Sequence, residues 1–447
     1  MPKFQKHVIL FGMKTFIVII SLVWSTCLSA RDIVLWHAFD GFLEEKFCEI
    51  IEDFNHHSGT YRIVPIRKGN YAEVYEQGVD SIREGNRPHI LQVYEVATLT
   101  MMLQEDCYVP VEELMSKYHR RFDPDVYIDS VRKFYSAPNG KMLSLPWNAS
   151  TGILFYNKEA FKEAGLDPEH APKTWPELEF MGKKLTQKGY KGFTTAWPAA
   201  YHLEHLCSWH DLPFGSHSNG FGGLEARLIF NQDPQVFHLS KLVEWQESGI
   251  FSYSGRFTEE PERRFAGGEC AILLQGANRL PLIQRKSSFN VGVGFMPYWP
   301  HLTEKPHTLN IGGASFWVMQ GFSDEEYRGI VQFFEYLSTT EVQAYWHQET
   351  GYLPITDAAY YLTKKKGFYK NHSAAEIAVL EVMQGHPSEN SYGVRFGNYI
   401  DVREVIMDNL ERAFRGESTA QEALNRAVKD GNEILEKFQK QHDQGST

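Results

Sequence analysis

The chain has 447 residues, of which 43% are hydrophobic and 23% are charged, and its formal net charge is −11. This composition is that of a globular protein and excludes a disordered, collagen-like or coiled-coil chain. One hydrophobic core rarely grows beyond about 250–300 residues, so we expect more than one domain. The acidic balance provides no basic surface for nucleic acid, and we expect no nucleic-acid partner.

The N-terminus has the pattern of a secretory signal peptide over residues 1–30. Lysines precede an apolar run at 16–24, and two small residues follow at 29–30. This order is typical of a cleaved signal, and the run is shorter than the roughly 20 residues of a membrane-spanning helix. We expect export, with translation starting at Met1 or Met13. Cleavage removes three lysines and no acid, so the net charge becomes −14.

Four cysteines remain after cleavage: Cys48, Cys107, Cys207 and Cys270. They are scattered and form no CxxC pair. We expect buried free thiols, although an oxidising compartment would permit a bridge.

Strands and helices alternate at the start of the mature chain. An apolar strand at 33–36 precedes a helix whose apolar residues between Phe42 and Phe54 share one face. A strand at 61–66, a helix beginning near Tyr71 and a strand at 90–94 follow. This alternation predicts a mainly parallel sheet covered on both faces.

The pattern restarts at Met142. Strand-like segments at 143–146 and 153–156 are joined by a polar stretch at 148–152. Thr174 then reads as the N-cap of a helix, with Glu177 completing a capping box.

Further strands are expected at 192–197, 271–274, 290–297 and 314–319, and from Asp324 the chain is mostly helical, ending in an amphipathic helix at 420–438. No flexible linker separates the two α/β units. We therefore expect lobes connected by more than one crossing of the chain.

Sequence motifs of catalysis and nucleotide binding are missing. The chain has no phosphate-binding glycine loop, dinucleotide fingerprint, nucleophile elbow or HExxH motif. The densest cluster of metal-ligand types comprises His202, His205, Cys207, His210 and Asp211. A partly exposed helix explains this cluster better than a metal site does. We predict no metal, no cofactor and no catalytic residue.

Five segments together resemble a known family: residues 68–71, 90–95, 172–175, 311–315 and 346–356. They are similar to the glycerol-3-phosphate-binding members of the extracellular solute-binding proteins, which are periplasmic subunits of ATP-driven (ABC) importers. The resemblance covers nearly all of the mature chain, in order. It implies the α/β class and a type II periplasmic binding protein fold, with two α/β lobes joined by a hinge of three crossovers. Lobe one is expected at 31–148 and 293–345, and lobe two at 149–292 and 346–447.

The same resemblance implies a ligand site shared by both lobes and the hinge. Its residues are Tyr71, Glu95, Ser150, Gly276, Gly313, Tyr352 and Arg395. Gly276 replaces a serine of the family, which removes one hydroxyl and is expected to leave room for a phosphodiester such as glycerophosphocholine.

These assignments also make chemical sense. The planar guanidinium of Arg395 is suited to binding two phosphate oxygens. Glu95, when ionised, only accepts hydrogen bonds and would take glycerol hydroxyls. An amide at Gly313 would reach an anion. Tyr71 and Tyr352 offer hydroxyl donors and ring faces.

Three tryptophans, Trp175, Trp197 and Trp209, sit at predicted ends of helices or strands. One or more would form an apolar wall of the site, although core packing is the commoner fate of such residues. Trp175 is the preferred candidate because it opens a helix whose N-terminus favours an anion.

The sequence therefore predicts a monomeric, non-catalytic protein that binds sn-glycerol-3-phosphate or a related glycerophosphodiester in the periplasm and delivers it to a membrane permease. Two alternatives stay open. One is a sugar-binding protein of the maltose-binding type, and the other is a secreted, metal-dependent phosphodiesterase using the cluster at 202–211.

Overall fold

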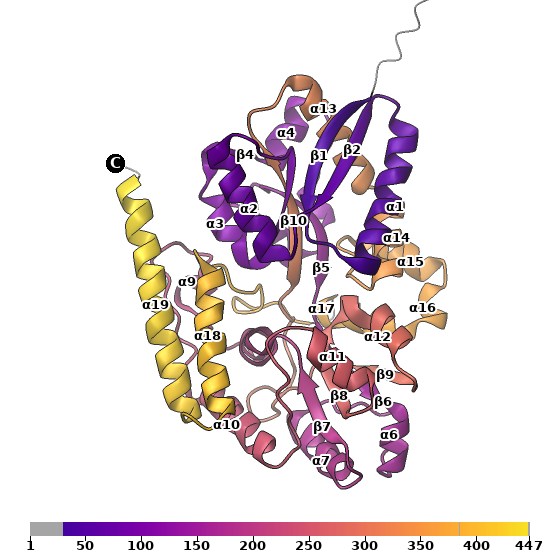
Figure 1. Ribbon diagram of the computed structural model, residues 1–447, viewed down its shortest axis with the longest axis vertical. Helices are drawn as coiled ribbons and strands as arrows, with labels where there is room; N and C mark the ends of the chain where they lie inside the picture. The colour runs from indigo at the N-terminus through magenta and orange to yellow at the C-terminus, as the bar shows by residue number, and fades with distance from the viewer. Residues whose placement is uncertain (1–29, 384, 446–447) are drawn as a thin grey trace, which may run out of the picture.

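The computed structural model describes residues 30–383 and 385–445 (Figure 1). The predicted signal peptide lies outside the described residues except for Ala30. Two separate sheets organise the molecule, and Figure 1 shows the larger in the upper half and the smaller in the lower half. Among the described residues, no helix combines the length and apolar character that a membrane crossing requires.

The larger sheet has six strands: β1 (Arg31–His37), β2 (Tyr61–Arg67), β3 (Ile90–Tyr94), β4 (Tyr108–Val109), β5 (Leu145–Ser150) and β10 (Gly312–Met319). Their order is β2-β1-β3-β10-β4, and β5 also pairs with β10. The first three strands are parallel, as predicted. The sheet as a whole is mixed, because β10 returns from the other half of the molecule and pairs antiparallel with β3, β4 and β5.

Helices cover both faces of this sheet: α1 (Gly41–Ser58), α2 (Tyr71–Glu84), α3 (Thr98–Met102), α4 (Val111–Lys117), α5 (Asp129–Phe134), α13 (Asp324–Leu337) and α14 (Thr340–Thr350). One core packs β1 and β10 against α1, α13 and α14. A second core packs the opposite face of β1, β3 and β10 against α2 and α3. Apolar side chains on both faces of these strands are therefore buried under helices.

The smaller sheet has four strands in the order β7-β8-β6-β9: β6 (Gly152–Asn157), β7 (Lys191–Thr195), β8 (Cys270–Gly276) and β9 (Val291–Gly294). Its helices are α6 (Lys158–Glu163), α7 (Trp175–Thr186), α8 (His205–Trp209), α9 (Ser216–Asn219), α10 (Asp233–Glu247), α11 (Glu259–Ala266) and α12 (Leu280–Lys286). The predicted capping box of α7 is confirmed, because Glu177 N donates to Thr174 Oγ1 and Thr174 N to Glu177 Oε2.

The C-terminal region is helical, as predicted: α15 (Asp357–Lys365), α16 (Phe368–Asn371), α17 (Ser373–Met383), α18 (Tyr399–Phe414) and α19 (Ala420–Gly445). In Figure 1, α18 and α19 lie side by side along one flank, and both belong to the core of the smaller-sheet half.

The chain passes between the two halves three times. It crosses from β5 to β6, from β9 to β10, and again between α14 and α18. This is the expected type II arrangement of two α/β lobes. The predicted lobe boundaries remain a proposal, although β5 runs on to Ser150 and the predicted boundary at 345/346 divides α14, which packs against the larger sheet.

The polar stretch at 148–152, expected to join two strands, is itself strand on both sides of Thr151. Asn148, Ala149 and Ser150 pair with β10, and Gly152 already pairs with β8, so Thr151 alone links the two sheets. The backbone continues the hydrogen-bonded ladder although the side chains are polar, and sequence patterning does not reveal this pairing.

The histidine-rich segment is buried, contrary to the predicted partly exposed helix. A π-helical turn (Ala200–Glu204) leads into α8, and the imidazoles find partners in the core. His202 Nδ1 lies 3.1 Å from His238 Nε2, and His210 Nε2 accepts from Trp299 N at 2.7 Å. Within residues 30–383 and 385–445, no three such ligand types are placed to hold a metal ion.

All four cysteines of the mature chain are free, as predicted, but the prediction that they are buried holds for two of them. Cys207 and Cys270 are buried, while Cys48 and Cys107 are half-buried.

Candidate ligand-binding site

Polar side chains from both halves meet beside the link at Thr151. Tyr71 and Tyr352 come together there, with their hydroxyl oxygens 3.4 Å apart. Asn148 Nδ2 donates to Tyr71 Oη at 3.0 Å, and Gln92 Nε2 donates to Asn148 Oδ1 at 3.1 Å. Gln92 and Asn148 were not among the predicted site residues.

Local structure fixes the position of each tyrosine. α2 begins at Tyr71 because Asn70 caps it, accepting from Glu73 N at 3.1 Å while Glu73 accepts from Asn70 N. The Tyr71 ring stacks on Tyr94, and the Tyr352 ring stacks on Trp346. Burial raises the pKa of both tyrosine hydroxyls, so they keep their protons and can donate hydrogen bonds.

Glu95 and Gly313 contact each other directly. Gly313 N donates to Glu95 Oε2 at 3.1 Å, so the amide expected to reach an anion instead binds a carboxylate of the protein. Gly313 has φ +133°, and a Cβ there would lie 2.0 Å from Asn148 O. Glycine is therefore required for the close approach of β10 to β5.

An arginine that the sequence analysis missed faces Glu95. Arg403, in the second turn of α18, places Nη1 3.3 Å from Glu95 Oε1. Its other edge, Nε and Nη2, binds the carboxylate of Glu204 at 2.9–3.1 Å. Burial raises the pKa of Glu204, which Arg403 opposes. Burial also opposes the charge of Arg403, but Glu204 and Glu95 raise its pKa overall, so it stays a cation.

A second arginine is held in the same way. Arg279 directs Nε and Nη2 at the buried carboxylate of Glu262, at 2.6 and 2.9 Å. Its positive charge opposes the rise in the pKa of the Tyr352 hydroxyl, whose main cause is burial. In both arginines, Nε and Nη2 bind a buried carboxylate, and Nη1 lies at the opposite end of the guanidinium.

Arg395 binds other groups than these, and its predicted role in binding phosphate stays a prediction. Its Nη1 donates to three backbone oxygens at the end of α5, those of Lys133, Phe134 and Ser136, at 3.4, 3.2 and 2.7 Å. Its guanidinium lies 4.2 Å from the centre of the Phe221 ring. Burial lowers its pKa to about 10. Arg395 therefore caps a helix and ties the two halves together.

Ser150 and Gly276 lie on opposite sides of the link, at the ends of β5 and β8. A Cβ on Gly276 would meet Asn278 Oδ1 at 2.6 Å and both Ser150 Oγ and Tyr201 Oη at 3.3 Å. The room that Gly276 was expected to leave is thus partly taken by the amide of Asn278. Ser150 Oγ lies 3.3 Å from that same oxygen.

Trp175 is a core residue, which corrects its assignment as an apolar wall. It is 2% exposed and packs against Trp245, Trp299 and His238. Trp209 is also buried and donates through Nε1 to Met296 O. Of the three tryptophans considered, only Trp197 keeps an exposed face.

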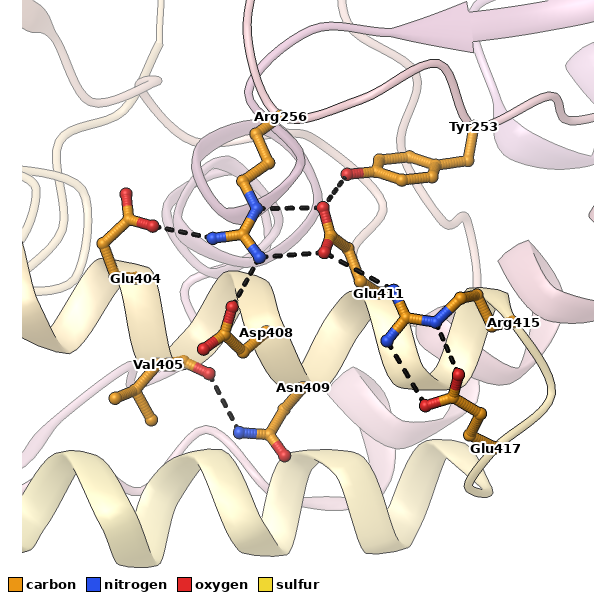
Figure 2. A network of polar contacts seen from close by, with 9 residues as sticks. All are labelled: Tyr253, Arg256, Glu404, Val405, Asp408, Asn409, Glu411, Arg415 and Glu417. Atoms are coloured by element: carbon orange, nitrogen blue, oxygen red, sulfur yellow. Dashed lines mark hydrogen bonds and ion pairs between the residues drawn. The ribbon is translucent and has the colours of Figure 1, made fainter.

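The helix that carries Arg403 is anchored by a network of ion pairs. Figure 2 shows Arg256 between three carboxylates of α18, at 2.7 Å from Glu404, 2.5 Å from Asp408 and 2.8 Å from Glu411. Glu411 also accepts from Tyr253 Oη. These contacts hold α18 against the loop that precedes α11.

Two α/β lobes, three crossings and polar groups of both lobes gathered at the join define a two-lobe solute-binding protein. The chain belongs to the family of bacterial extracellular solute-binding proteins, whose sequence profile matches residues 49–376.

Two relatives are similar over almost their whole length. The sn-glycerol-3-phosphate-binding periplasmic protein UgpB of Salmonella typhimurium (strain LT2) is 41% identical over 415 residues, covering 92% of this chain and 94% of the relative. UgpB of Escherichia coli O6:K15:H31 is 42% identical over 410 residues, covering 91% and 93%.

Solved structures confirm the fold. UgpB from Mycobacterium tuberculosis in complex with glycerophosphocholine has a TM-score of 0.76 at 19% identity, covering 92% of this chain and 99% of the other. The GacH receptor of Streptomyces glaucescens has a TM-score of 0.75 at 15% identity, covering 92% and 100%.

Proposed function

We propose that this protein is the periplasmic solute-binding subunit of an ABC importer and that it binds sn-glycerol-3-phosphate and glycerophosphodiesters without reacting with them. The observation that carries the proposal is the ion pair at 3.3 Å between Glu95 of the larger-sheet half and Arg403 of the other half. The UgpB relatives at 41–42% identity support the ligand class and the compartment.

The arrangement suits a ligand with an anionic end and a polyol end. Arg403 and Arg279 are oriented in advance by buried carboxylates. Nη1 of Arg279 is therefore available to phosphate oxygens at little cost in side-chain entropy, whereas Nη1 of Arg403 binds Glu95 at 3.3 Å. Glu95 only accepts, which suits glycerol hydroxyls. Tyr71 and Tyr352 supply hydroxyl donors. The expected roles of Tyr71, Glu95, Ser150, Gly276, Gly313, Tyr352 and Arg395 stay predictions, and Arg403 is added to them.

Binding is coupled to closure of the lobes in this proposal. Tyr71, Glu95 and Gly313 belong to the larger-sheet lobe, whereas Gly276 and Arg403 belong to the other. A ligand that contacts both sets binds the closed form better and shifts the population toward it. The membrane permease would then recognise the closed form of a monomer.

Site chemistry argues against the two alternatives. A sugar site of the maltose-binding type has no need of two arginines held at the join. The phosphodiesterase alternative uses His202, His205 and His210, and each of these imidazoles is buried and hydrogen-bonded within the core. Buried neutral imidazoles are available neither to a metal from solvent nor to a substrate.

A ligand screen tests the proposal. Thermal unfolding should be followed with glycerol-3-phosphate, glycerophosphocholine, maltose and inorganic phosphate. A ligand present at about 100 times its Kd stabilises the folded state by about 2.7 kcal/mol, which raises the unfolding midpoint measurably. We expect this rise with one or both glycerol phosphates. A rise with maltose alone would refute the proposal.

A further inference from the structure

The carboxylate of Glu262, in the first turn of α11, is buried near the candidate site. Its Oε1 accepts hydrogen bonds from Arg279 Nε at 2.6 Å and from Gln275 Nε2 at 2.9 Å, and its Oε2 accepts from Arg279 Nη2 at 2.9 Å. Gln275 is oriented in turn, because its Oε1 accepts from Gly276 N at 2.7 Å. Burying an ionised carboxylate is costly unless it is paired and hydrogen-bonded. Arg279 supplies the opposite charge, so the two side chains form one ion-paired unit.

Arg279 lies at the edge of the site because of the turn that carries it. The turn Ala277–Arg279 follows β8 directly. A Cβ on Gly351 would lie 2.8 Å from Ala277 O, so the turn packs closely against the residue before Tyr352. Burial raises the pKa of the Tyr352 hydroxyl, and the positive charge of Arg279 opposes this rise. The guanidinium therefore acts on one of the two tyrosines in which the lobes meet.

One end of the Arg279 guanidinium is left without a protein partner. The side chain of Arg279 is 21% exposed, whereas that of Glu262 is 4% exposed. Glu262 uses Nε and Nη2, and within the described part of the chain no residue accepts a hydrogen bond from Nη1. Burial opposes the charge of Arg279, but the hydrogen bonds and charge of Glu262 raise its pKa overall. Arg279 is thus a fixed cation with a free donor.

The other arginine of the site has more anionic partners. Arg403 binds Glu204 through Nε and Nη2, and its Nη1 lies 3.3 Å from Glu95. A phosphate that approaches this Nη1 also meets the negative charge of Glu95, which repels it. Among residues 30–383 and 385–445, only Glu262 forms an ion pair with Arg279. Arg279 is therefore the better suited of the two to bind a phosphate.

Glu262 contributes the orientation of this cation. An arginine side chain free in solvent occupies many rotamers, and fixing it when a ligand binds costs entropy. Two parallel N–H···O bonds to one carboxylate fix the plane of the guanidinium before the ligand arrives. The hydrogen bond from Gln275 holds the carboxylate itself in place.

We propose that Glu262 is a positioning residue, which holds Arg279 as a phosphate-binding residue of the site. This inference rests on the proposed function, because the phosphate belongs to the solute bound there. Glu262 does not touch the solute. Its contribution to affinity passes through the charge and orientation of Arg279, so the two residues act as one unit.

A double-mutant cycle tests the proposal. Calorimetry measures the affinity for glycerol-3-phosphate of the wild type, Glu262→Gln, Arg279→Gln and the double variant. We expect Arg279→Gln to weaken binding about 10-fold, the lower end of the range for a charged hydrogen bond, because the side chain is partly exposed. Glu262→Gln should weaken binding about 3- to 10-fold, because its amide cannot accept both N–H groups and the guanidinium loses its fixed orientation. The double variant should bind like Arg279→Gln.

Arg279→Lys tests the same point without changing the buried carboxylate. Lysine keeps the positive charge but cannot make two parallel hydrogen bonds to Glu262. We expect it to weaken binding about as much as Glu262→Gln does. Glu269→Gln is the matched control, because Glu269 binds Arg264 of α11 through Nε and Nη2 at 2.8 and 2.5 Å, and its side chain is 47% exposed. Losing this pair should leave the affinity unchanged.

Three results would overturn the positioning role. They are equal weakening by Glu262→Gln with and without Arg279, wild-type affinity in Arg279→Lys, and wild-type affinity in Arg279→Gln. Each of them leaves the proposed function intact, since the wild type still binds glycerol-3-phosphate. Wild-type protein that binds no glycerol phosphate would overturn the proposed function as well.

Discussion

Acid should destabilise this protein through buried histidines, and His347 gives the clearest case. Its Nδ1 lies 2.5 Å from Tyr352 O and its Nε2 lies 2.7 Å from Tyr369 Oη. A carbonyl only accepts, so Nδ1 carries the proton and Nε2 accepts from the tyrosine. Burial lowers the pKa of His347 to about 4, against an ordinary 6.5.

The magnitude follows from this difference in pKa. The unfolded chain takes up a proton at His347 near pH 6.5, whereas the folded chain does so only near pH 4. Stability is therefore complete above pH 6.5 and is lost as the pH falls toward 4. At pH 5 the free energy of unfolding should be about 2 kcal/mol lower than at pH 7.5 from this one group.

Urea unfolding followed by tryptophan fluorescence at pH 7.5 and pH 5 measures the effect. The amide of His347→Gln can donate to Tyr352 O and accept from Tyr369 Oη without titrating. We expect the loss of stability between the two pH values to be about 2 kcal/mol smaller in this variant than in the wild type. His57→Gln is the control, because the side chain of His57 is 71% exposed. If His347→Gln loses as much stability as the wild type, the reasoning fails.

Further substitutions distinguish residues that bind the ligand from residues that stabilise the fold. Arg403→Gln should weaken glycerol-3-phosphate binding about 10- to 150-fold in calorimetry, since a charged hydrogen bond contributes about 1.5–3 kcal/mol. Arg395→Gln should lower the melting temperature and change affinity much less, and the opposite pattern would support its predicted role in binding phosphate. Gly313→Ala should cost about 1–3 kcal/mol in urea unfolding, because φ is +133° and the new Cβ meets Asn148 O. A fully stable Gly313→Ala protein would show that this approach of β10 to β5 is adaptable.

Local patterns predicted the elements well because their causes are local. β3 spans 90–94 as predicted, since a short apolar run bounded by Pro88 and a polar turn favours a buried strand. Thr174 and Glu177 cap α7 because the hydrogen bonds of a capping box span only three residues. The antiparallel direction of β10 was not predicted, because its pairing with β3 joins segments more than 200 residues apart and local patterns carry no information about it.

The site was predictable only where a family motif marked it. Tyr71, Glu95, Gly313 and Tyr352 carry such motifs, and the structure brings them together beside Thr151. Arg403 lies in an ordinary amphipathic helix, 308 residues from Glu95 and outside the segments that carry the family resemblance. The two arginines differ in their partners, because Arg403 contacts carboxylates and Arg395 contacts backbone carbonyls. The prediction that Trp175 forms an apolar wall of the site was wrong, because a tryptophan at the start of a helix can pack into the core equally well.

The single-residue link at Thr151 has a mechanical consequence. Its hydroxyl donates to Asn310 O at 3.1 Å, so the first two crossings of the chain are fastened to each other at one point. Rotation of the lobes about this point displaces atoms in proportion to their distance from it. Ser150 and Gly313, which adjoin the pivot, keep nearly constant spacing through the swing, while side chains at the outer ends of both lobes travel furthest. In the lobe closure proposed above, a solute would contact the nearly stationary groups first and the distant groups afterwards.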